Sequence, residues 1–411
     1  MALVRVPYGV GYIEALVDAE VEVALPRSLG AVDPQAILRE ALANPMASGG
    51  LEEFLTGKIL CIVNDATRTT PTAAVLEAIY PQLKDREIEF LVATGAHRGP
   101  TEEEYRGIFG RHYGEFKGRV WAHDARGDEM AYAGRTGRGT EVYINRRFWD
   151  ADRVLVIGSV EPHYYAGFTG GRKAIIPGIA AFRTIEENHR LALEEGAGIM
   201  RLEGNPVEED LEEALQLLRK EIFSITAVTD GRGEVCTAYA GDLGETFRAA
   251  VEKAKEVYSV KVGLPADVVV TAAGPPMDKS LYQAHKALYN GALGLREGGI
   301  LILVSRCGEG IGDEGLREAM VKGRDPQGVL ALARGHYRLG YQTAVSISRL
   351  ALKYRVWGVT GLARGGPEEA FMQPFGSLQG ALDEALEGRE DVRVLVLPEG
   401  SVTVPIPAQP Q

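Results

Sequence analysis

Cysteine is scarce in this sequence: Cys61, Cys236 and Cys307 are odd in number and lie far apart. They form neither a zinc-type pair nor a disulfide framework. Long apolar runs are also missing, because no stretch approaches the roughly 20 residues that span a bilayer. The first residues lack the apolar core of a signal peptide. We therefore expect a cytoplasmic protein without a membrane-spanning segment.

An excess of positive charge is absent as well. The 411 residues carry a formal net charge of −12, and the sequence pI is near 5.3. Such a balance argues against nucleic acid or an anionic membrane as a partner. The apolar fraction of 45% is ordinary for a globular protein, and the length suggests two or three domains with sizeable cores.

One pattern occurs three times: an apolar strand, a polar loop and a helix, at 59–72, 88–104 and 154–189. This alternation is typical of an open, mostly parallel α/β sheet. A second series of buried strands begins at 266 and continues near 299–304, 355–359 and 392–397. The sequence therefore predicts an α/β fold with two domains, each a mostly parallel Rossmann-like sheet flanked by helices.

We place the N-terminal domain at 1–260, the C-terminal domain at 261–398 and a loose, proline-rich tail at 399–411. Period-two alternation predicts paired strands within 2–25, and Asp33-Pro34 predicts the start of a helix that extends to 56. Thr101 and Glu104 have the spacing of a capping box.

Polar and charged side chains follow the predicted strands of the first domain. In open α/β sheets, ligands bind at the carboxyl ends of the strands. Five such side chains in three successive loops indicate a single site, and we expect it in the cleft between the domains. They are Asp65, Arg68, His97, His163 and Lys173.

The third loop is rich in glycine, at Gly167, Gly170 and Gly171, and closes with Lys173; His189 lies in the helix that follows. Glycine allows positive φ and a close backbone approach to a ligand, and a strand, glycine turn and helix start often bind an anion. A Walker loop is excluded, since the spaced first glycine and the Ser or Thr after the lysine are missing.

Each of these residues also has a structural interpretation. A single histidine is often a hydrogen-bonded structural residue, a lysine a solvated charge, and Asp65 a helix N-cap. Arg68 nevertheless suits a bidentate grip on a carboxylate. Cys307 is interpreted as a small packed thiol. In the second domain, Tyr282, Gln283 and Lys286 would share one helix face and form a wall of the cleft.

Taken together, two or three imidazoles, a lysine, an arginine and an aspartate suit proton or hydride transfer on a small carboxylic acid. The same residues resemble a known family, the nickel-pincer lactate racemases and their 2-hydroxyacid racemase and epimerase relatives. The similarity covers most of the chain. It rests on the segments Asp65–Arg68, Ala93–Arg98, Glu161–His163, Gly167–Lys173, Asn188-His189 and Tyr282–Lys286.

The resemblance implies a nickel cofactor, a pyridinium-3,5-bisthiocarboxylic acid mononucleotide that holds nickel in a pincer and is made by cofactor-maturation enzymes. Lys173 would carry it covalently and His189 would be the nickel ligand, in keeping with the affinity of imidazole for nickel. Asp65, Gly170 and Gly171 would also bind the cofactor. His97 and His163 would be the acid/base pair. Arg68, Tyr282, Gln283 and Lys286 would bind the substrate.

The reaction that the resemblance implies is racemisation or epimerisation of a 2-hydroxyacid by reversible hydride transfer to the cofactor. Ala66 stands where we expect a histidine in lactate-type members, so the substrate need not be lactate. Two alternatives are a non-catalytic protein that binds or delivers the cofactor or a nucleotide, and an enzyme with a pyridoxal-type Schiff base on Lys173. The retained pair of His97 and His163 favours the racemase, because a carrier needs only Lys173 and His189.

Overall fold

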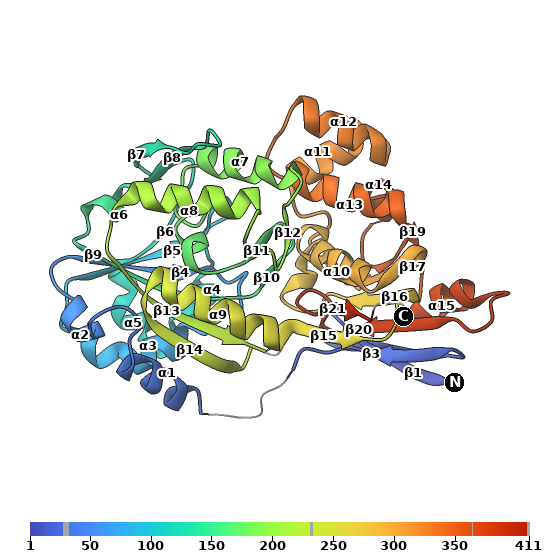
Figure 1. Ribbon diagram of the computed structural model, residues 1–411, viewed down its shortest axis with the longest axis horizontal. Helices are drawn as coiled ribbons and strands as arrows, with labels where there is room; N and C mark the ends of the chain where they lie inside the picture. The colour runs from blue at the N-terminus through green and yellow to red at the C-terminus, as the bar shows by residue number, and fades with distance from the viewer. Residues whose placement is uncertain (28–32, 231–232, 364, 409–411) are drawn as a thin grey trace. The chain divides into compact units, whose positions relative to one another are not determined.

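The computed structural model describes residues 1–27, 33–230, 233–363 and 365–408. The chain divides into two compact units, of which one comprises 28–256 and the other comprises 1–27 together with 257–411. Each unit contains a six-stranded sheet flanked by helices (Figure 1). The prediction of an α/β fold with mostly parallel sheets is therefore confirmed.

The sheet of the 28–256 unit has the strand order β14-β13-β9-β4-β5-β6. All neighbouring pairs are parallel except β13 and β14, which are antiparallel. The strands are β4 (Ile59–Asn64), β5 (Ile88–Ala93), β6 (Val120–Ala122), β9 (Arg153–Ser159), β13 (Ile222–Thr229) and β14 (Val235–Asp242).

Helices and two small sheets complete this unit. The helices are α1 (Pro34–Ala43), α2 (Leu51–Phe54), α3 (Thr72–Leu83), α4 (Glu102–Phe109), α5 (Tyr113–Phe116), α6 (Arg146–Asp150), α7 (Phe182–Arg190), α8 (Pro206–Leu218) and α9 (Leu243–Tyr258). The small sheets pair β7 (Met130–Arg135) with β8 (Glu141–Asn145), and β10 (Pro162–His163) with β11 (Ala166–Phe168) and β12 (Gly198–Ile199).

The sheet of the other unit is parallel throughout, in the order β19-β18-β17-β16-β20-β3. Its strands are β3 (Glu20–Val23), β16 (Ala266–Ala272), β17 (Leu295–Ser305), β18 (Arg355–Thr360), β19 (Gln373–Pro374) and β20 (Arg393–Leu397). Its helices are α10 (Leu281–Leu293), α11 (Glu314–Gly323), α12 (Pro326–Gly335), α13 (Tyr341–Lys353), α14 (Gly366–Glu369) and α15 (Leu378–Leu386).

The first 27 residues, which we predicted to lie in the domain 1–260, belong instead to the unit that contains residues 257–411. β3 extends the second sheet by pairing with β20. The hairpin of β1 (Ala2–Tyr8) and β2 (Gly11–Val17) contributes Val4, Val6, Ala15 and Val17 to the core of that unit. Alternation predicted the strands, but a strand cannot indicate which sheet it will join.

Two local expectations also needed correction. The segment 33–56 is not one helix, since α1 ends before Pro45 and Met46 then pairs with the β14 region by donating from its N–H to Ala240. The tail is not wholly loose, because β21 (Val404–Pro407) pairs with β15 (Ser259–Val262). Residues 409–411 of that tail lie outside the described residues.

The capping box of Thr101 and Glu104 is confirmed, with both reciprocal bonds present at 3.3 and 2.8 Å.

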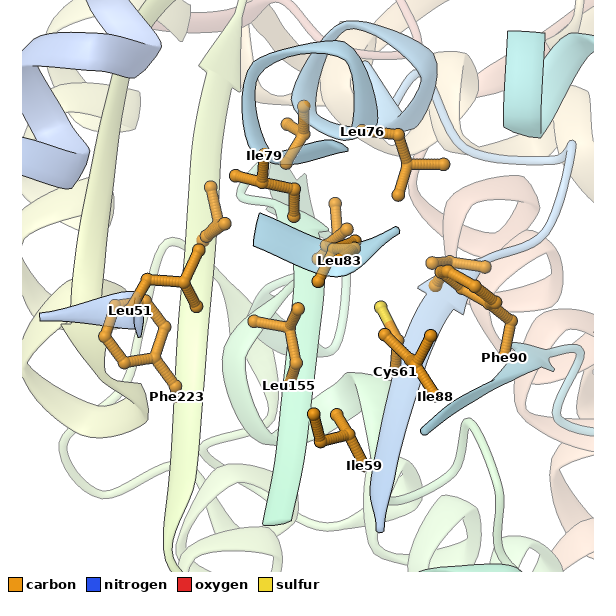
Figure 2. Packing of buried hydrophobic residues seen from close by; sticks show 14 of the residues in the cluster. Leu51, Ile59, Cys61, Leu76, Ile79, Leu83, Ile88, Phe90, Leu155 and Phe223 are labelled. Carbon is orange, nitrogen blue, oxygen red and sulfur yellow. The ribbon is translucent and has the colours of Figure 1, made fainter. Parts of the chain in front are cut away.

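The hydrophobic core of the 28–256 unit lies between the sheet and the helices α1–α5. Figure 2 shows Leu76, Ile79 and Leu83 of α3 packed toward strand residues that include Cys61 and Leu155. The spacing of these α3 residues places them on one helical face, which explains why this segment forms an amphipathic helix against the sheet.

Phe90 on β5 tests this core. Its buried ring lies 5.3 Å from the ring of Phe109 and 4.6 Å from that of Phe116. We expect Phe90→Ala to lower the free energy of unfolding of this unit by about 3–5 kcal/mol, because it leaves a cavity. Chemical denaturation measures the change. Val321→Ala, at a 55% exposed position, should change stability by no more than about 0.5 kcal/mol.

Candidate active site

Three loops of the 28–256 unit begin at the carboxyl ends of neighbouring strands in its sheet. β9, β4 and β5 are parallel neighbours, so the loops that follow them emerge side by side. Side chains join two of these loops: the hydroxyl groups of Thr70 and Ser159 lie 2.7 Å apart, and Thr69 donates to the carboxylate of Glu161. The expectation of adjacent polar loops at this edge agrees with the observed strand order.

Asp65 and His97 come from two of these loops and form a hydrogen-bonded pair. Nδ1 of His97 lies 2.9 Å from Oδ2 of Asp65. The other carboxylate oxygen, Oδ1, accepts bonds from the backbone N–H and the hydroxyl of Thr67, at 3.1 and 2.6 Å. Asp65 is buried, whereas the side chain of His97 is 39% exposed. The aspartate therefore fixes an imidazole whose other nitrogen remains available.

The electrostatics of Asp65 favour its ionised form. Burial acts to raise the pKa of this carboxyl, but hydrogen bonds from His97 and Thr67 and the charges of His97 and Arg68 outweigh it, so the pKa is lowered. An ionised carboxylate can only accept hydrogen bonds. Nδ1 of His97 must then donate the hydrogen of the pair, so Nε2 is the ring nitrogen that faces away from Asp65.

Tyr165 lies at the centre of the remaining site residues. Its ring centroid is 4.4 Å from that of His163 and 5.4 Å from that of His189, and Nζ of Lys173 is 5.2 Å from the same centroid. His163 ends β10 and Tyr165 lies in the turn that follows it, whereas His189 belongs to α7 and Lys173 to the short 3₁₀ helix Gly171–Ala174. One aromatic ring thus brings together three residues that the sequence predicted separately.

His189 is held neutral. Burial lowers the pKa of its imidazole to about 3, and the charges of Lys173 and His97 act in the same direction. No hydrogen bond to its Nδ1 is formed among the described residues. The carbonyl of Ile185, one turn earlier on α7, interacts with the ring and acts weakly to raise the pKa of His189. A neutral imidazole keeps one ring nitrogen unprotonated, and such a nitrogen can bind a metal ion.

Backbone conformation and close packing both require glycine at two positions of the glycine loop. Gly170 and Gly171 have φ values of 80° and 54°. A Cβ atom on Gly170 would lie 2.5 Å from the carbonyl oxygen of Ser159, and one on Gly171 would lie 2.7 Å from the ring of Phe247. Both positions therefore require glycine for conformation and for packing, and together they set the path of the backbone that leads into Lys173.

The predicted substrate residues of the second half lie on α10, in the other unit. Nζ of Lys286 donates to Oε1 of Gln283 at 2.9 Å and lies 3.6 Å from the sulfur of Met277. Tyr282 accepts through its carbonyl from Nδ1 of His285, at 2.6 Å. Gln283 and Lys286 thus present one hydrogen-bonded polar pair on the helix, as their spacing predicted. Burial raises the pKa of the Cys307 thiol to about 11, in line with a packed thiol.

Sequence reasoning missed three residues of the site. Tyr165 was not selected because an aromatic residue next to a histidine carries no chemical signature in sequence. Glu161 and Thr69 are distant in the sequence and bond only because two loops meet in the fold. The position of Glu161 next to His163 and close to the glycine loop was a usable sequence signal. In the structure the N–H of Thr169 donates to its carbonyl at 2.7 Å.

Comparison with known proteins matches both halves of the chain. A family model described as the lactate racemase N-terminal domain matches residues 8–199, and one described as the lactate racemase C-terminal domain matches residues 261–405. A lactate racemase of Thermoanaerobacterium thermosaccharolyticum is 30% identical over 97% of this chain and 98% of its own length. This chain belongs to the lactate racemase family.

Other relatives agree with that assignment. A lactate racemase of Lactiplantibacillus plantarum is 29% identical over 97% of this chain and 99% of its own length. The structure of the lactate racemase apoprotein from T. thermosaccharolyticum superposes with a TM-score of 0.88, at 29% identity over 98% of this chain and all of that chain. A protein from Thermotoga maritima shares the fold, with a TM-score of 0.73 at 18% identity.

Metal-ligating clusters and membrane-spanning helices are the next features of this lactate racemase family member. Within the described parts of the chain, no group of three or more His, Cys, Asp or Glu side chains is arranged to hold a metal ion. Among the helices described, none has the length and apolar character needed to cross a membrane.

The lowered pKa of Asp65 predicts a dependence of stability on pH. A carboxyl whose pKa is lower in the folded state stabilises the fold above its unfolded pKa, near 3.8, and loses that contribution as the pH falls through the folded value. Unfolding in urea gives the free energy of unfolding of wild type and of Asp65→Asn. As the pH falls from about 5 to 3, the amount by which the wild-type value exceeds that of Asp65→Asn should decrease. A difference that is constant over this range would contradict the assignment.

Proposed function

We propose that this protein is a racemase or epimerase of 2-hydroxyacids, similar to lactate racemase, that depends on a nickel-pincer pyridinium mononucleotide attached to Lys173. The observation that carries the proposal is the cluster of His163, Lys173 and His189 around the ring of Tyr165. It occurs in a chain that matches curated lactate racemases over nearly its whole length.

The residues present fit such a cofactor. His189 supplies a buried neutral imidazole, which keeps one ring nitrogen unprotonated, and imidazole is a suitable nickel ligand. Lys173 would hold the group covalently, with Gly170, Gly171 and Asp65 beside it. When bound, the cofactor would supply a reversible acceptor for the α-hydrogen and its electron pair.

The two histidines would divide the proton transfers. Asp65 holds His97 so that Nε2 is the acceptor. The backbone N–H of Ala166 approaches Nδ1 of His163 at 3.4 Å, which favours the opposite tautomer, with the proton on Nε2. In these tautomers Nε2 of His97 would accept the proton of the substrate hydroxyl and later return it to the product oxygen. His163 would act as the base once its proton has moved from Nε2 to Nδ1, which frees Nε2 to accept. Because the enantiomers present their hydroxyl groups differently, each hand would use a different histidine as base.

Arg68 would bind the substrate carboxylate. Its half-buried guanidinium lies near Asp65, whose pKa it helps to lower, and its planar fork suits a bidentate grip on a carboxylate. The proposal also assigns Tyr282, Gln283 and Lys286 to substrate binding, with Lys286 as a second cation for the acid. This donor set selects a 2-hydroxy carboxylic acid as the substrate class.

Attachment is tested by mass spectrometry of protein made together with the cofactor-maturation enzymes. Wild type should carry an added mass on the peptide that contains Lys173, and the protein should contain nickel. Lys173→Ala should carry neither, because the attachment point is gone, whereas the control Lys220→Ala should match wild type. An adduct on Lys173→Ala would overturn the assignment. Wild type that carries cofactor without racemising any 2-hydroxyacid would instead support a delivery protein.

The division of labour between the histidines gives a second test. His97→Ala and His163→Ala should each slow racemisation by roughly 100-fold or more, the scale of a general-base contribution. Each variant is also mixed with one pure enantiomer for a single turnover, and the absorbance of the cofactor is followed. The two variants should differ in which enantiomer still changes that absorbance. His112→Ala serves as a control, because its ring instead stacks on Tyr80. If both variants respond alike to both enantiomers, the two-base scheme is wrong.

A further inference from the structure

Helix α8 buries polar side chains at its N-terminal end. Asn205, the N-cap, is 0% exposed, Glu208 is 3% exposed and Asp210 is 1% exposed. Burying carboxylates is costly unless they are paired or hydrogen-bonded. An amphipathic surface helix does not need such groups, so their partners are informative.

The first partner is the turn that carries Tyr165. Nδ2 of Asn205 donates to the carbonyl of Tyr165 at 2.8 Å and to that of Arg201 at 2.9 Å. Oδ1 of the same side chain accepts from the N–H of Val207 at 3.1 Å and so caps the helix. The N-cap of α8 therefore fixes the backbone of the residue whose ring contacts His163, His189 and Lys173.

The second partner is the residue before Lys173. Arg172 forms ion pairs with Glu208 and, at 3.0 Å, with Glu212 one turn later on α8. Its guanidinium lies 4.6 Å above the ring of Phe247. The side chain is buried, and burial lowers the pKa of Arg172 to about 10. These contacts hold the short 3₁₀ helix from which Lys173 projects.

The third partner is the residue before His189. Oδ2 of Asp210 accepts from Nδ2 of Asn188 at 2.9 Å and from the hydroxyl of Thr140 at 2.8 Å, while Oδ1 accepts from the hydroxyl of Thr136 at 2.5 Å. Asn188 is fully buried on α7, which lies beside α8 (Figure 1). The carboxylate thus fixes the rotation of α7 about its axis, and with it the direction of His189.

We propose that α8 is the positioning element of this site. Asn205, Glu208 and Asp210 set the mutual placement of Tyr165, Lys173 and His189, through the backbone of Tyr165 and through the residues that precede Lys173 and His189. The three contacts reach three separate segments from one rigid helix, so the segments cannot shift independently. The cofactor role of Lys173 and His189 rests on the proposed function, whereas the arrangement of α8 and its partners does not.

The test uses three variants that change the contact and retain the local fold. Asn205→Ser keeps an N-cap but loses the amide donor to Tyr165. Glu208→Gln keeps the shape but loses the charge opposite Arg172. Asp210→Asn replaces one acceptor with a donor facing Asn188. Two controls accompany them: Gln216→Ala at an exposed position of α8, and Leu76→Ala, which destabilises the buried core of the same unit at α3.

The first measurement uses the loaded enzyme and follows the loss of nickel to a chelator well below the unfolding temperature, together with kcat and KM. Outer contacts of a metal ligand typically change metal affinity or activity by roughly 10- to 100-fold. Asp210→Asn should lose nickel faster by a factor in that range and lose kcat more than KM. Leu76→Ala, although less stable, should retain nickel as wild type does. Equal nickel loss in Asp210→Asn and Leu76→Ala would overturn the proposal.

The second measurement uses the chain made without the maturation enzymes, so it does not depend on the proposed function. Peptide mass spectrometry follows the modification of Lys173 by an amine-reactive reagent. Lys173 is 8% exposed in wild type, and Glu208→Gln and Asn205→Ser should raise its rate of modification well above that in either control. Unchanged rates would refute the positioning role. A wild type that accepts no cofactor would refute the function alone.

Discussion

The parallel alignment of β9, β4 and β5 is the constraint on which this site depends. Because the three strands are neighbours and run in one direction, the loops after them start at the same sheet edge. The pair of Asp65 and His97 spans the loops after β4 and β5, and Thr70 meets the end of β9. A single antiparallel strand among the three would have sent one of these loops to the opposite edge.

Burial gives these residues properties that they would lack at the surface. Desolvation keeps His189 neutral, whereas hydrogen bonds and neighbouring cations keep Asp65 ionised in spite of desolvation. One group is thus driven toward its neutral form and the other toward its anionic form. This difference gives one residue the character of a metal ligand and the other that of an orienting anion, which agrees with the proposed chemistry.

The surroundings of the site are built from polar contacts rather than from apolar packing alone. Asn205, Glu208 and Asp210 are buried on one helix, and each engages the backbone or side chain of a residue at the site or next to it. A hydrophobic contact tolerates small displacements, whereas a hydrogen bond to a buried group is lost over less than an ångström. Such contacts therefore determine the positions of the site residues more strongly than they determine the stability of the fold.

The sequence by itself determined most strands of the two six-stranded sheets, the helices α3, α4, α7 and α10, the capping box and the polar loops after β4, β5 and β9, because these follow from local periodicity and from turn-forming residues. It also determined the family, through the motifs around Asp65, His97, His163, Lys173 and His189. Only the tertiary structure decided that β3 joins the second sheet, that Tyr165 lies among three site residues and that α8 holds their neighbours. Those contacts join residues up to hundreds of positions apart, and no local pattern encodes a partner that only folding brings near.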